Sequence, residues 1–325
     1  MLLDVRSAVS FAFKLSRYFL FCPELYRKAL ELCRFNRYDY ILCDYGLSGV
    51  YGLLLSRRFG VPFIYCSHNL EHRMYWGKSK KDYRRLVFLP YVYLIERLSV
   101  RNAWLTVAIS RDDAKFYRSW TRAERIMVIP QGFDPDVFYP KPAEAPRIPG
   151  TVLFCGNLKL GPNQQALSII LEHILPRVVR SHPDVLFKIV GANPPSASSH
   201  ANLEFTGFVE DYPGMLREAD VVISPLKQGW GFPTKIVEAL ASGKPTVATR
   251  IGARTIETDF AALMIRTIEQ FPDTICQILD KGFVPSKDDV IKLRNRYSWS
   301  ANLERLIRFM NRTQQERVEY EQENR

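Results

Sequence analysis

Lys235 and Glu238 are the side chains of this 325-residue chain best suited to bind a ligand, because they directly follow a glycine-rich run, Gly229-Trp-Gly-Phe-Pro233. A helix is predicted to begin near Thr234, and residues three apart share one face of a helix. The unpaired amides at a helix N-terminus and the helix dipole favour negative charge there. A lysine can neutralise phosphates, and a glutamate can accept hydrogen bonds from sugar hydroxyls. The pattern therefore predicts a site for a nucleotide sugar.

The segments around this run have the composition needed to hold it in place. An apolar strand is predicted over 221–224, before the run, and a second one from Pro245, after a turn at Ser242-Gly243. Strand, loop, helix and strand in this order form the unit that places phosphate groups at a helix N-terminus.

The same alternation of strands and helices is predicted along the whole chain. Apolar runs predict strands over 40–43, 62–66, 104–109, 125–129, 151–155, 185–190, 202–205 and 262–265. Periodic segments predict helices over 24–35, 48–59, 82–101, 111–120, 163–180 and 212–219. Apolar strands that alternate with helices indicate parallel sheets covered on both faces. The fold class is therefore expected to be α/β, with two Rossmann-like lobes facing a cleft.

A proline-rich segment separates the two series of strands. Residues 139–150 contain four prolines, a composition typical of an exposed linker or a domain boundary. We therefore expect one lobe over residues 1–138 and a second lobe over residues 139–299, which contains the glycine-rich run.

Positive charge is concentrated in the first half of the chain. Residues 1–140 hold 22 Lys and Arg against 13 Asp and Glu, whereas residues 141–325 hold 23 against 21. The asymmetry indicates an anionic partner for the first lobe. Basic residues alternate with large apolar ones over 5–21 and 78–86, which favours an anionic membrane surface or a lipid-phosphate acceptor over nucleic acid. A core-facing helix with a solvated basic face is the structural alternative.

Other classes of protein are disfavoured by the composition. No apolar run approaches the roughly 18 residues of a membrane span, and the N-terminus lacks the pattern of a secretory signal. The six cysteines show no short paired spacing and are expected to be reduced thiols. His68 and His72 are four residues apart, but no third ligand follows nearby, so no metal site is expected.

Five motifs follow one another in the second half of the chain. They are Gly156-Asn-Leu-Lys-Leu-Gly-Pro-Asn163, Phe187-Lys-Ile-Val-Gly191, Phe205-Thr-Gly-Phe-Val209, Ala219-Asp-Val-Val-Ile-Ser-Pro225 and the run from Gly229 to Ala239. In this order they resemble the nucleotide-sugar lobe of the retaining GT-B glycosyltransferases, a family-4-like class also called glycosyl transferases group 1. The resemblance extends from about residue 133 to 299, with weaker matches in the first lobe. It also implies that a tail helix over about 300–325 packs back on the first lobe.

The resemblance assigns roles to residues around the predicted helix N-terminus. Glu238 matches the family glutamate that accepts hydrogen bonds from the ribose hydroxyls, and Lys235 would face the diphosphate. The donor sugar would be approached by Gly231, Phe232 and Pro233. The first phosphate-facing loop would be bracketed by Gly156 and Asn163. The donor-binding candidates are Glu238, Lys235, Gly231, Phe232, Pro233, Gly156, Lys159 and Asn163.

Three positions depart from the family pattern. Trp230 stands where many members have a glutamate that contacts the donor sugar. Asn157 and Pro162 stand where many members have an arginine and a lysine. The usual pair of phosphate cations is therefore missing, which would make Lys235 the main phosphate cation and leaves the sugar open.

His68 is the catalytic candidate in the first lobe. Residues 62–71 resemble the family strand that ends in a histidine, so His68 would hydrogen-bond a sugar hydroxyl or the attacking hydroxyl. A capping or core histidine is the alternative. Ser110 is expected to cap the helix that follows it. The strand and glycine-rich loop with which the family usually begins are not found before Asp39, so a shortened first lobe is expected.

Taken together, the sequence predicts a metal-independent, retaining hexosyltransferase. Its substrates would be a UDP- or GDP-sugar donor and a hydroxyl of a glycan or lipid-linked acceptor, with no cofactor and no nucleic-acid partner. It is expected in the cytoplasm, with peripheral attachment to the inner face of the membrane left open. The alternative is a non-catalytic glycosyltransferase-like subunit that binds a nucleotide sugar or a partner enzyme.

Overall fold

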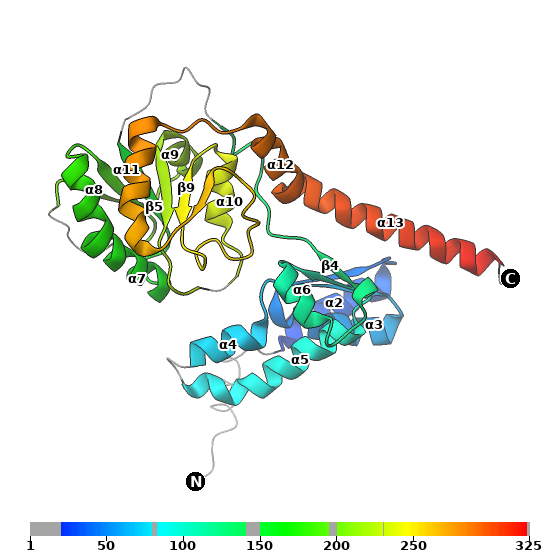
Figure 1. Ribbon diagram of the computed structural model, residues 1–325. Helices are drawn as coiled ribbons and strands as arrows, with labels where there is room; N and C mark the ends of the chain where they lie inside the picture. Colours follow the sequence, from blue (N-terminus) through cyan, green and yellow to red (C-terminus); the bar gives the residue numbers. More distant parts are fainter. Residues whose placement is uncertain (1–20, 80–82, 141–149, 195–199, 230, 324–325) are drawn as a thin grey trace, which may run out of the picture. The chain divides into compact units, whose positions relative to one another are not determined.

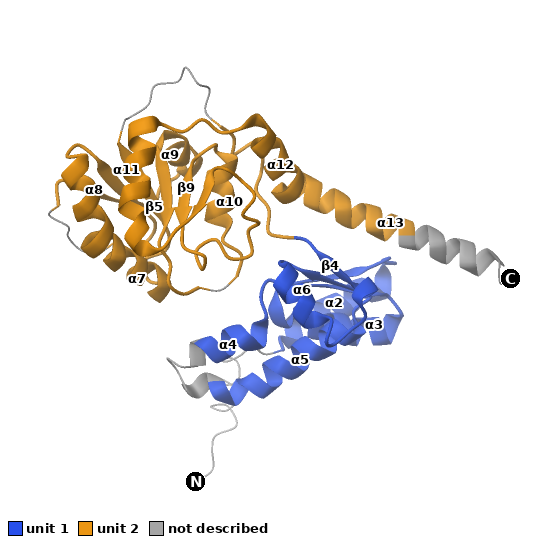
Figure 2. Cartoon of the chain, viewed as in Figure 1, with its two compact units in different colours: residues 1–129 blue, residues 130–325 orange. Residues whose placement is uncertain are grey.

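The structure is a computed structural model that describes residues 21–79, 83–140, 150–194, 200–229 and 231–323. The chain divides into two compact units, Met1–Ile129 and Pro130–Arg325 (Figure 2). The division lies before the proline-rich segment because residues 130–133 bond to the second unit: the Asn302 side chain donates to the Pro130 carbonyl at 2.8 Å. The helix α13 (Trp299–Glu323) belongs to the second unit. Its packing on the first lobe stays a prediction.

The first unit is a four-stranded parallel sheet with helices packed on it. The sheet order is β1-β2-β3-β4, the order of the chain. Its strands are β1 (Ile41–Asp44), β2 (Phe63–Cys66), β3 (Leu105–Ala108) and β4 (Ile126–Val128). Its helices are α2 (Pro23–Phe35), α3 (Gly49–Phe59), α4 (Glu71–Ser79), α5 (Leu89–Asn102) and α6 (Arg111–Tyr117).

Close helix–sheet packing explains the small residues of this unit. A Cβ at Gly52 of α3 would lie 2.4 Å from the Cys43 sulfur and 2.6 Å from the Phe63 ring, so only glycine fits there. The core around it is apolar, with Phe63 and Tyr65 fully buried. Ser110 caps α6 as predicted, because its hydroxyl accepts a hydrogen bond from the Asp113 amide at 3.1 Å.

The second unit contains a six-stranded parallel sheet in the order β10-β9-β8-β5-β6-β7. The strands are β5 (Thr151–Cys155), β6 (Leu186–Val190), β7 (Leu203–Gly207), β8 (Val221–Ser224), β9 (Thr246–Ala248) and β10 (Leu263–Ile265). The helices are α7 (Gly161–Ile169), α8 (Leu175–Ser181), α9 (Tyr212–Glu218), α10 (Thr234–Ala241), α11 (Phe271–Lys281) and α12 (Lys287–Tyr297).

Helices cover both faces of this sheet (Figure 1). Alternate residues of β5 point to opposite faces: Val152 and Phe154 pack with α7, α8 and α11, whereas Leu153 and Cys155 pack with α9 and α10. Both faces are buried, which explains why the strand reads as an uninterrupted apolar run.

The predicted α/β class with two Rossmann-like lobes is confirmed, and the described strands lie within a residue or two of the predicted ones. Two differences stand out. The segment 71–79 forms the unpredicted helix α4, and the predicted helix over 163–180 contains a π-helical turn over Ile170–Ile174. In the part of the chain that the structure describes, no helix is long and apolar enough to cross a membrane.

Candidate functional site

The sheet of the second unit has a topological switch point, where the chain leaves two neighbouring strands toward opposite edges of the sheet. β5 pairs with β8, and the chain continues from β5 to β6 on one side and from β8 to β9 on the other. In open parallel sheets, ligands bind outside the carboxyl ends of two such strands. Here those ends lead into the loops 156–160 and 225–233 and from there into α7 and α10, and these loops and helices contain the predicted donor-binding residues.

Lys235 connects the two strands at this point. It lies in the first turn of α10, and its ammonium donates to the carbonyl oxygen of Cys155, at the end of β5, over 2.8 Å. The same ammonium lies 4.9 Å from the centre of the Phe154 ring. Burial lowers the pKa of Lys235, while electrostatic interactions with Cys155 and Glu238 act in the opposite direction. An ammonium has three donors, so the bond to Cys155 leaves capacity for phosphate oxygens.

Glu238 lies one turn further along α10, beside Tyr212 of α9. Burial raises the pKa of the Glu238 carboxyl, and a hydrogen bond from Tyr212 and the charge of Lys235 lower it in part. The Tyr212 hydroxyl also lies 3.0 Å from the Cys155 sulfur. The hydrogen bond from Tyr212 therefore orients the Glu238 carboxylate. The sequence analysis missed this residue, which lies 57 positions from Cys155 along the chain.

The loop after β5 is held by asparagine side chains. Asn163 is buried, and its amide donates to the Asn157 carbonyl at 2.9 Å. A Cβ at Gly156 would lie 2.7 Å from the Asn163 side chain, so that position requires glycine. Gly156 and Asn163 thus shape the loop between them. Lys159 is exposed within it, and its amide donates to the Asn157 side chain at 2.9 Å.

Arg254, in the loop after β9, holds the glycine-rich loop by hydrogen bonds to its carbonyl groups. Its guanidinium donates to the carbonyl of Gly231 through Nε, at 3.1 Å, and Nη2, at 2.7 Å, and to the carbonyl of Gly229 through Nη1. Gly231 has a φ of 75°, in the left-handed region that glycine adopts without strain. Arg254 follows β9, and the sequence analysis did not single it out. Fixing these carbonyls fixes the amides that alternate with them.

The end of the glycine-rich loop leads straight into α10. Phe232 is buried, with its ring centre 5.9 Å from that of Tyr297, so its side chain anchors the loop. Pro233 occupies the N-cap position and has no side-chain acceptor, and the amides of Thr234 and Ile236 donate to the backbone carbonyls of Phe232 and Pro233, each at 3.0 Å. The N-terminus of α10 lacks a side-chain cap, and the positive end of its helix dipole favours an anion. Trp230 lies outside the described residues.

The loop after β9, which carries Arg254, is fastened to the loop after β8. The Thr249 hydroxyl donates to the Leu226 carbonyl and accepts a hydrogen bond from the Gly252 amide at 2.9 Å. A Cβ at Gly252 would lie 2.5 Å from the Ser224 carbonyl oxygen, which no backbone could accommodate without moving. The two loops therefore behave as one structural piece, and Arg254 is held in place relative to α10.

The catalytic candidate His68 belongs to the first unit, at the end of β2. Its Nε2 lies 2.7 Å from Oδ1 of Asp44, at the end of β1. Its neighbour Ser67 is buried and shares a 2.6 Å hydrogen bond with the Tyr117 hydroxyl. Tyr117 in turn donates to the buried Glu96 at 2.8 Å. This network fixes the turn that carries His68.

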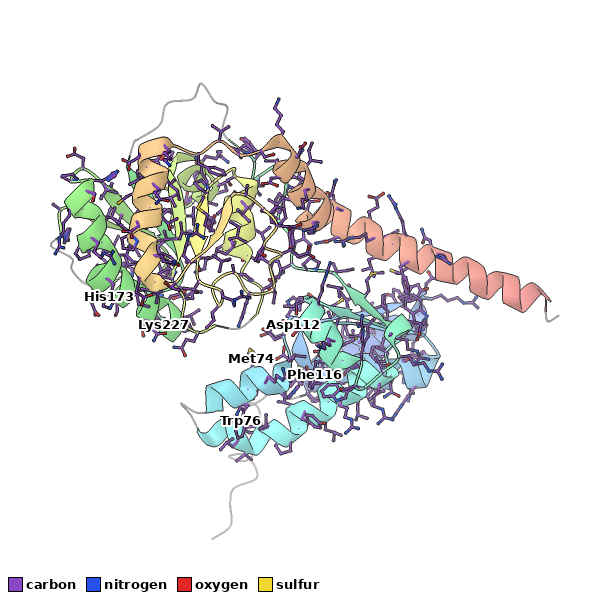
Figure 3. The ribbon with its side chains drawn as sticks, in the orientation of Figure 1. Met74, Trp76, Asp112, Phe116, His173 and Lys227 are labelled. Atoms are coloured by element: carbon purple, nitrogen blue, oxygen red, sulfur yellow. The ribbon has the colours of Figure 1, made fainter. Side chains whose placement is uncertain are left out.

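Glu96 also caps α4 from outside that helix. Its carboxylate accepts hydrogen bonds from the amides of Glu71 and His72, each at 3.0 Å, and lies 2.7 Å from His72 Nδ1. The His72 ring packs 5.1 Å from Phe116, which α6 contributes (Figure 3). His72 is therefore a structural residue. Among the described residues, no group of three or more His, Cys, Asp or Glu side chains could hold a metal ion.

Both halves of the chain match models of one protein class. Residues 149–281 match the family described as Glycosyl transferases group 1, and residues 3–137 match Glycosyltransferase Family 4. The chain belongs to these glycosyltransferases. Among solved structures, the Anabaena protein HepE, in complex with UDP and glucose, has a TM-score of 0.65 at 18% identity, covering 89% of this chain and 80% of that one. The sucrose-phosphate synthase of Thermosynechococcus elongatus has a TM-score of 0.66 at 19% identity, covering 90% and 77%. These likenesses establish the GT-B fold.

Curated glycosyltransferases are similar over part of their length. The phosphatidyl-myo-inositol mannosyltransferase of Mycobacterium tuberculosis is 30% identical over 205 residues, which is 55% of this chain and 52% of the relative. The D-inositol 3-phosphate glycosyltransferase of Arthrobacter sp. is 30% identical over 247 residues, which is 67% of this chain and 55% of the relative. The chain thus spans about half the length of these curated relatives.

Proposed function

We propose that this glycosyltransferase moves a hexose from a nucleotide-diphosphate sugar, with UDP or GDP as the nucleotide, to a hydroxyl of a glycan or lipid-linked acceptor. The observation that carries the proposal is the pairing of Lys235 and Glu238 on the first two turns of α10, at the carboxyl ends of β5 and β8. A helix N-terminus, a cation and a carboxylate within one site match the chemistry of a nucleotide sugar.

Each group in the site has a defined task in this proposal. Glu238 accepts hydrogen bonds from the ribose hydroxyls, held in place by the Tyr212 hydroxyl. Lys235 and the positive end of the α10 dipole stabilise the negative charge that develops on the departing diphosphate. These groups replace a metal ion. A departing phosphate oxygen accepts the proton of the attacking hydroxyl, and the transfer retains the anomeric configuration.

The names of similar proteins support this choice of substrates. UDP and glucose were observed in the structure of HepE, which makes a UDP-sugar a suitable first donor to test. The two curated relatives are named for inositol-containing acceptors, and one of them is named as a mannosyltransferase. We therefore place inositol derivatives and lipid-linked glycans first among the acceptors.

Contact with an anionic membrane surface from the cytoplasmic side is a second part of the proposal. Residues 73–86 contain six Lys and Arg and one Asp, and Trp76 of α4 is 54% exposed (Figure 3). Val87, just before α5, and Leu94 of α5 are exposed as well, and α5 packs against α4. A basic sequence segment together with exposed apolar side chains suits a lipid headgroup region. Co-sedimentation with vesicles containing phosphatidylglycerol, but not with pure phosphatidylcholine vesicles, is the expected result.

The proposal is tested by a thermal-shift panel of UDP-, GDP-, ADP- and dTDP-sugars, followed by turnover assays with the donor that binds. One donor should raise the melting temperature of the wild-type chain and leave that of Glu238→Ala unchanged. Transfer to an inositol derivative by the isolated chain would exclude the alternative of a non-catalytic subunit. Absence of a shift with every nucleotide sugar would contradict the proposed function.

A further inference from the structure

A cavity of the second unit lies at the end of the sheet opposite to the candidate donor site. Its lining includes Asp220 and Lys244, just before β8 and β9, and Ser242 and Gly282, just after α10 and α11. The cavity therefore lies at the amino ends of the strands. Its volume is about 230 Å³. A cavity of about 150 Å³ already holds a benzene ring, so this one accommodates a small organic molecule.

Most of the cavity wall is apolar. Pro140, Pro245, Ile278, Phe283 and Pro285 line it. Pro245 and Ile278 are buried, and the other three are partly covered. Proline side chains have no rotamer freedom to lose when a ligand covers them, so an apolar contact here costs little entropy. The wall therefore favours a ligand with an apolar body.

The Ser242 side chain makes part of the wall polar. Ser242 is 1% exposed, and its hydroxyl has no hydrogen-bond partner within the part of the chain that the structure describes. Buried hydroxyl groups are almost always hydrogen-bonded, so one without a partner indicates a place where another molecule completes the bond. The turn that carries Ser242 is closely packed, because a Cβ at Gly243, whose φ is 72°, would lie 3.0 Å from Pro140. The ligand should therefore carry a hydrogen-bonding group.

The electrostatics of the cavity favour a positive group on the ligand. Asp220 and Lys244 are the charged residues among its described lining, so their charges balance. The C-termini of α10 and α11 both lie at the cavity, and the carbonyls at a helix C-terminus carry partial negative charge. The Thr151 amide donates to Oδ2 of Asp220 at 3.0 Å, which holds a carboxylate that can accept further donors. A primary ammonium, with three donors, matches these acceptors.

We propose that this cavity binds a small primary amine with an apolar body, of the arylalkylamine class. The ammonium donates to the Asp220 carboxylate, to the Ser242 hydroxyl and to a carbonyl at the end of α10 or α11. The apolar body packs against the prolines and Phe283. The inference is independent of the proposed function, because the cavity lies beyond the C-terminal end of α10, whereas Lys235 reaches the carboxyl end of β5.

Saturation-transfer NMR titrations of the full chain test the site with three probes that share one body and differ in charge. The probes are 2-phenylethylamine, 2-phenylethanol and phenylacetate. We expect the amine to bind about fivefold more tightly than the alcohol, or better, and the acid to bind most weakly. Asp220→Asn keeps an oxygen that accepts the Thr151 amide but removes the negative charge, so amine affinity should fall about fivefold while alcohol affinity stays unchanged.

Two further variants complete the test. Lys244→Met keeps an apolar stem and removes the opposing positive charge, so amine affinity should rise. Glu218→Gln is the matched control for Asp220→Asn, because Glu218 is an exposed acid two residues earlier, and it should bind the amine as the wild type does. If Asp220→Asn has a lowered melting temperature, Lys244→Met decides, and an unchanged amine affinity there contradicts the proposal.

Three other results would also overturn the site. They are the absence of binding of any probe to the wild type, acid binding as tight as amine binding, and equal amine affinities in Asp220→Asn and Glu218→Gln. Loss of amine binding in Glu238→Gln, with wild-type binding in Asp220→Asn, would place the amine at the candidate donor site instead.

Discussion

Replacing Arg254 tests whether the glycine-rich loop is held in place for donor binding. Arg254→Met removes the guanidinium that bonds the carbonyls of Gly229 and Gly231. Hydrogen bonds from charged groups contribute about 1.5–3 kcal/mol each. Because Arg254 is only half-buried, we take about 1 kcal/mol for each carbonyl, and about 2 kcal/mol for the loop. Since 1.4 kcal/mol corresponds to a tenfold change, donor affinity should fall about 30-fold.

Isothermal titration of the full chain with the donor identified by thermal shift measures this effect. Arg254→Lys keeps the charge but loses the planar fork, so its affinity should lie between those of the wild type and Arg254→Met. Arg250→Met is the matched control, because Arg250 is exposed and lies in the same loop. Equal donor affinities in Arg254→Met and Arg250→Met would refute the reasoning. If the glycine-rich loop also resisted protease equally in both variants, Arg254 would not be what holds that loop in place.

Three further results are expected. Tyr212→Phe removes one hydrogen bond to Glu238 and should lower donor affinity about threefold to tenfold by titration, with an unchanged melting temperature; a wild-type affinity would mean that the carboxylate is held by other groups. Burial raises the pKa of Glu238 and lowers that of Lys235. As the pH falls, Glu238 is therefore protonated earlier than an ordinary glutamate, and as it rises Lys235 is neutralised earlier than an ordinary lysine. Donor affinity should thus fall at both limits, and a flat profile would argue against both roles. A Cβ at Gly191, whose φ is 143°, would lie 2.2 Å from the Gly156 carbonyl oxygen. Gly191→Ala should therefore destabilise the chain by roughly 2–4 kcal/mol in chemical unfolding, and a loss below 1 kcal/mol would be unexpected.

The sequence allowed the local part of the donor site to be predicted. Uninterrupted apolar runs indicate buried parallel strands, and the glycine-rich run before Thr234 indicates the start of α10. Lys235 and Glu238 lie on that same helix, so their spacing alone places them together. Their roles toward a donor remain predictions.

The residues that hold the donor site in place could not be predicted, because Tyr212 comes from α9 and Arg254 from the loop after β9. Arg254 lies 23 residues from Gly231, and Tyr212 lies 57 residues from Cys155. Arg254 meets the site because β9 lies beside β8 in the sheet, and Tyr212 meets it because α9 packs on the same face of the sheet as α10. A single sequence does not reveal the order of strands in a sheet, so it could not indicate that Arg254 and Tyr212 lie near the donor site.

The two errors in secondary structure also have physical reasons. The helix α4 has its N-terminal amides capped by Glu96, 25 residues later in α5, so no local capping signal precedes it. The π-helical turn over Ile170–Ile174 comes just before Pro176 in the first turn of α8. Proline has no amide to donate and its ring displaces the preceding turn, which widens the helix there.

Titration of a nucleotide sugar into Glu238→Gln tests the central claim most directly. This variant keeps the size of the side chain and removes the charge with which Glu238 would accept the ribose hydroxyls. Glu218→Gln, an exposed glutamate at the end of α9, is the matched control. The account predicts that the control binds the donor as the wild type does, while the affinity of Glu238→Gln falls at least tenfold. Equal affinities in the two variants would contradict the assignment of the donor site.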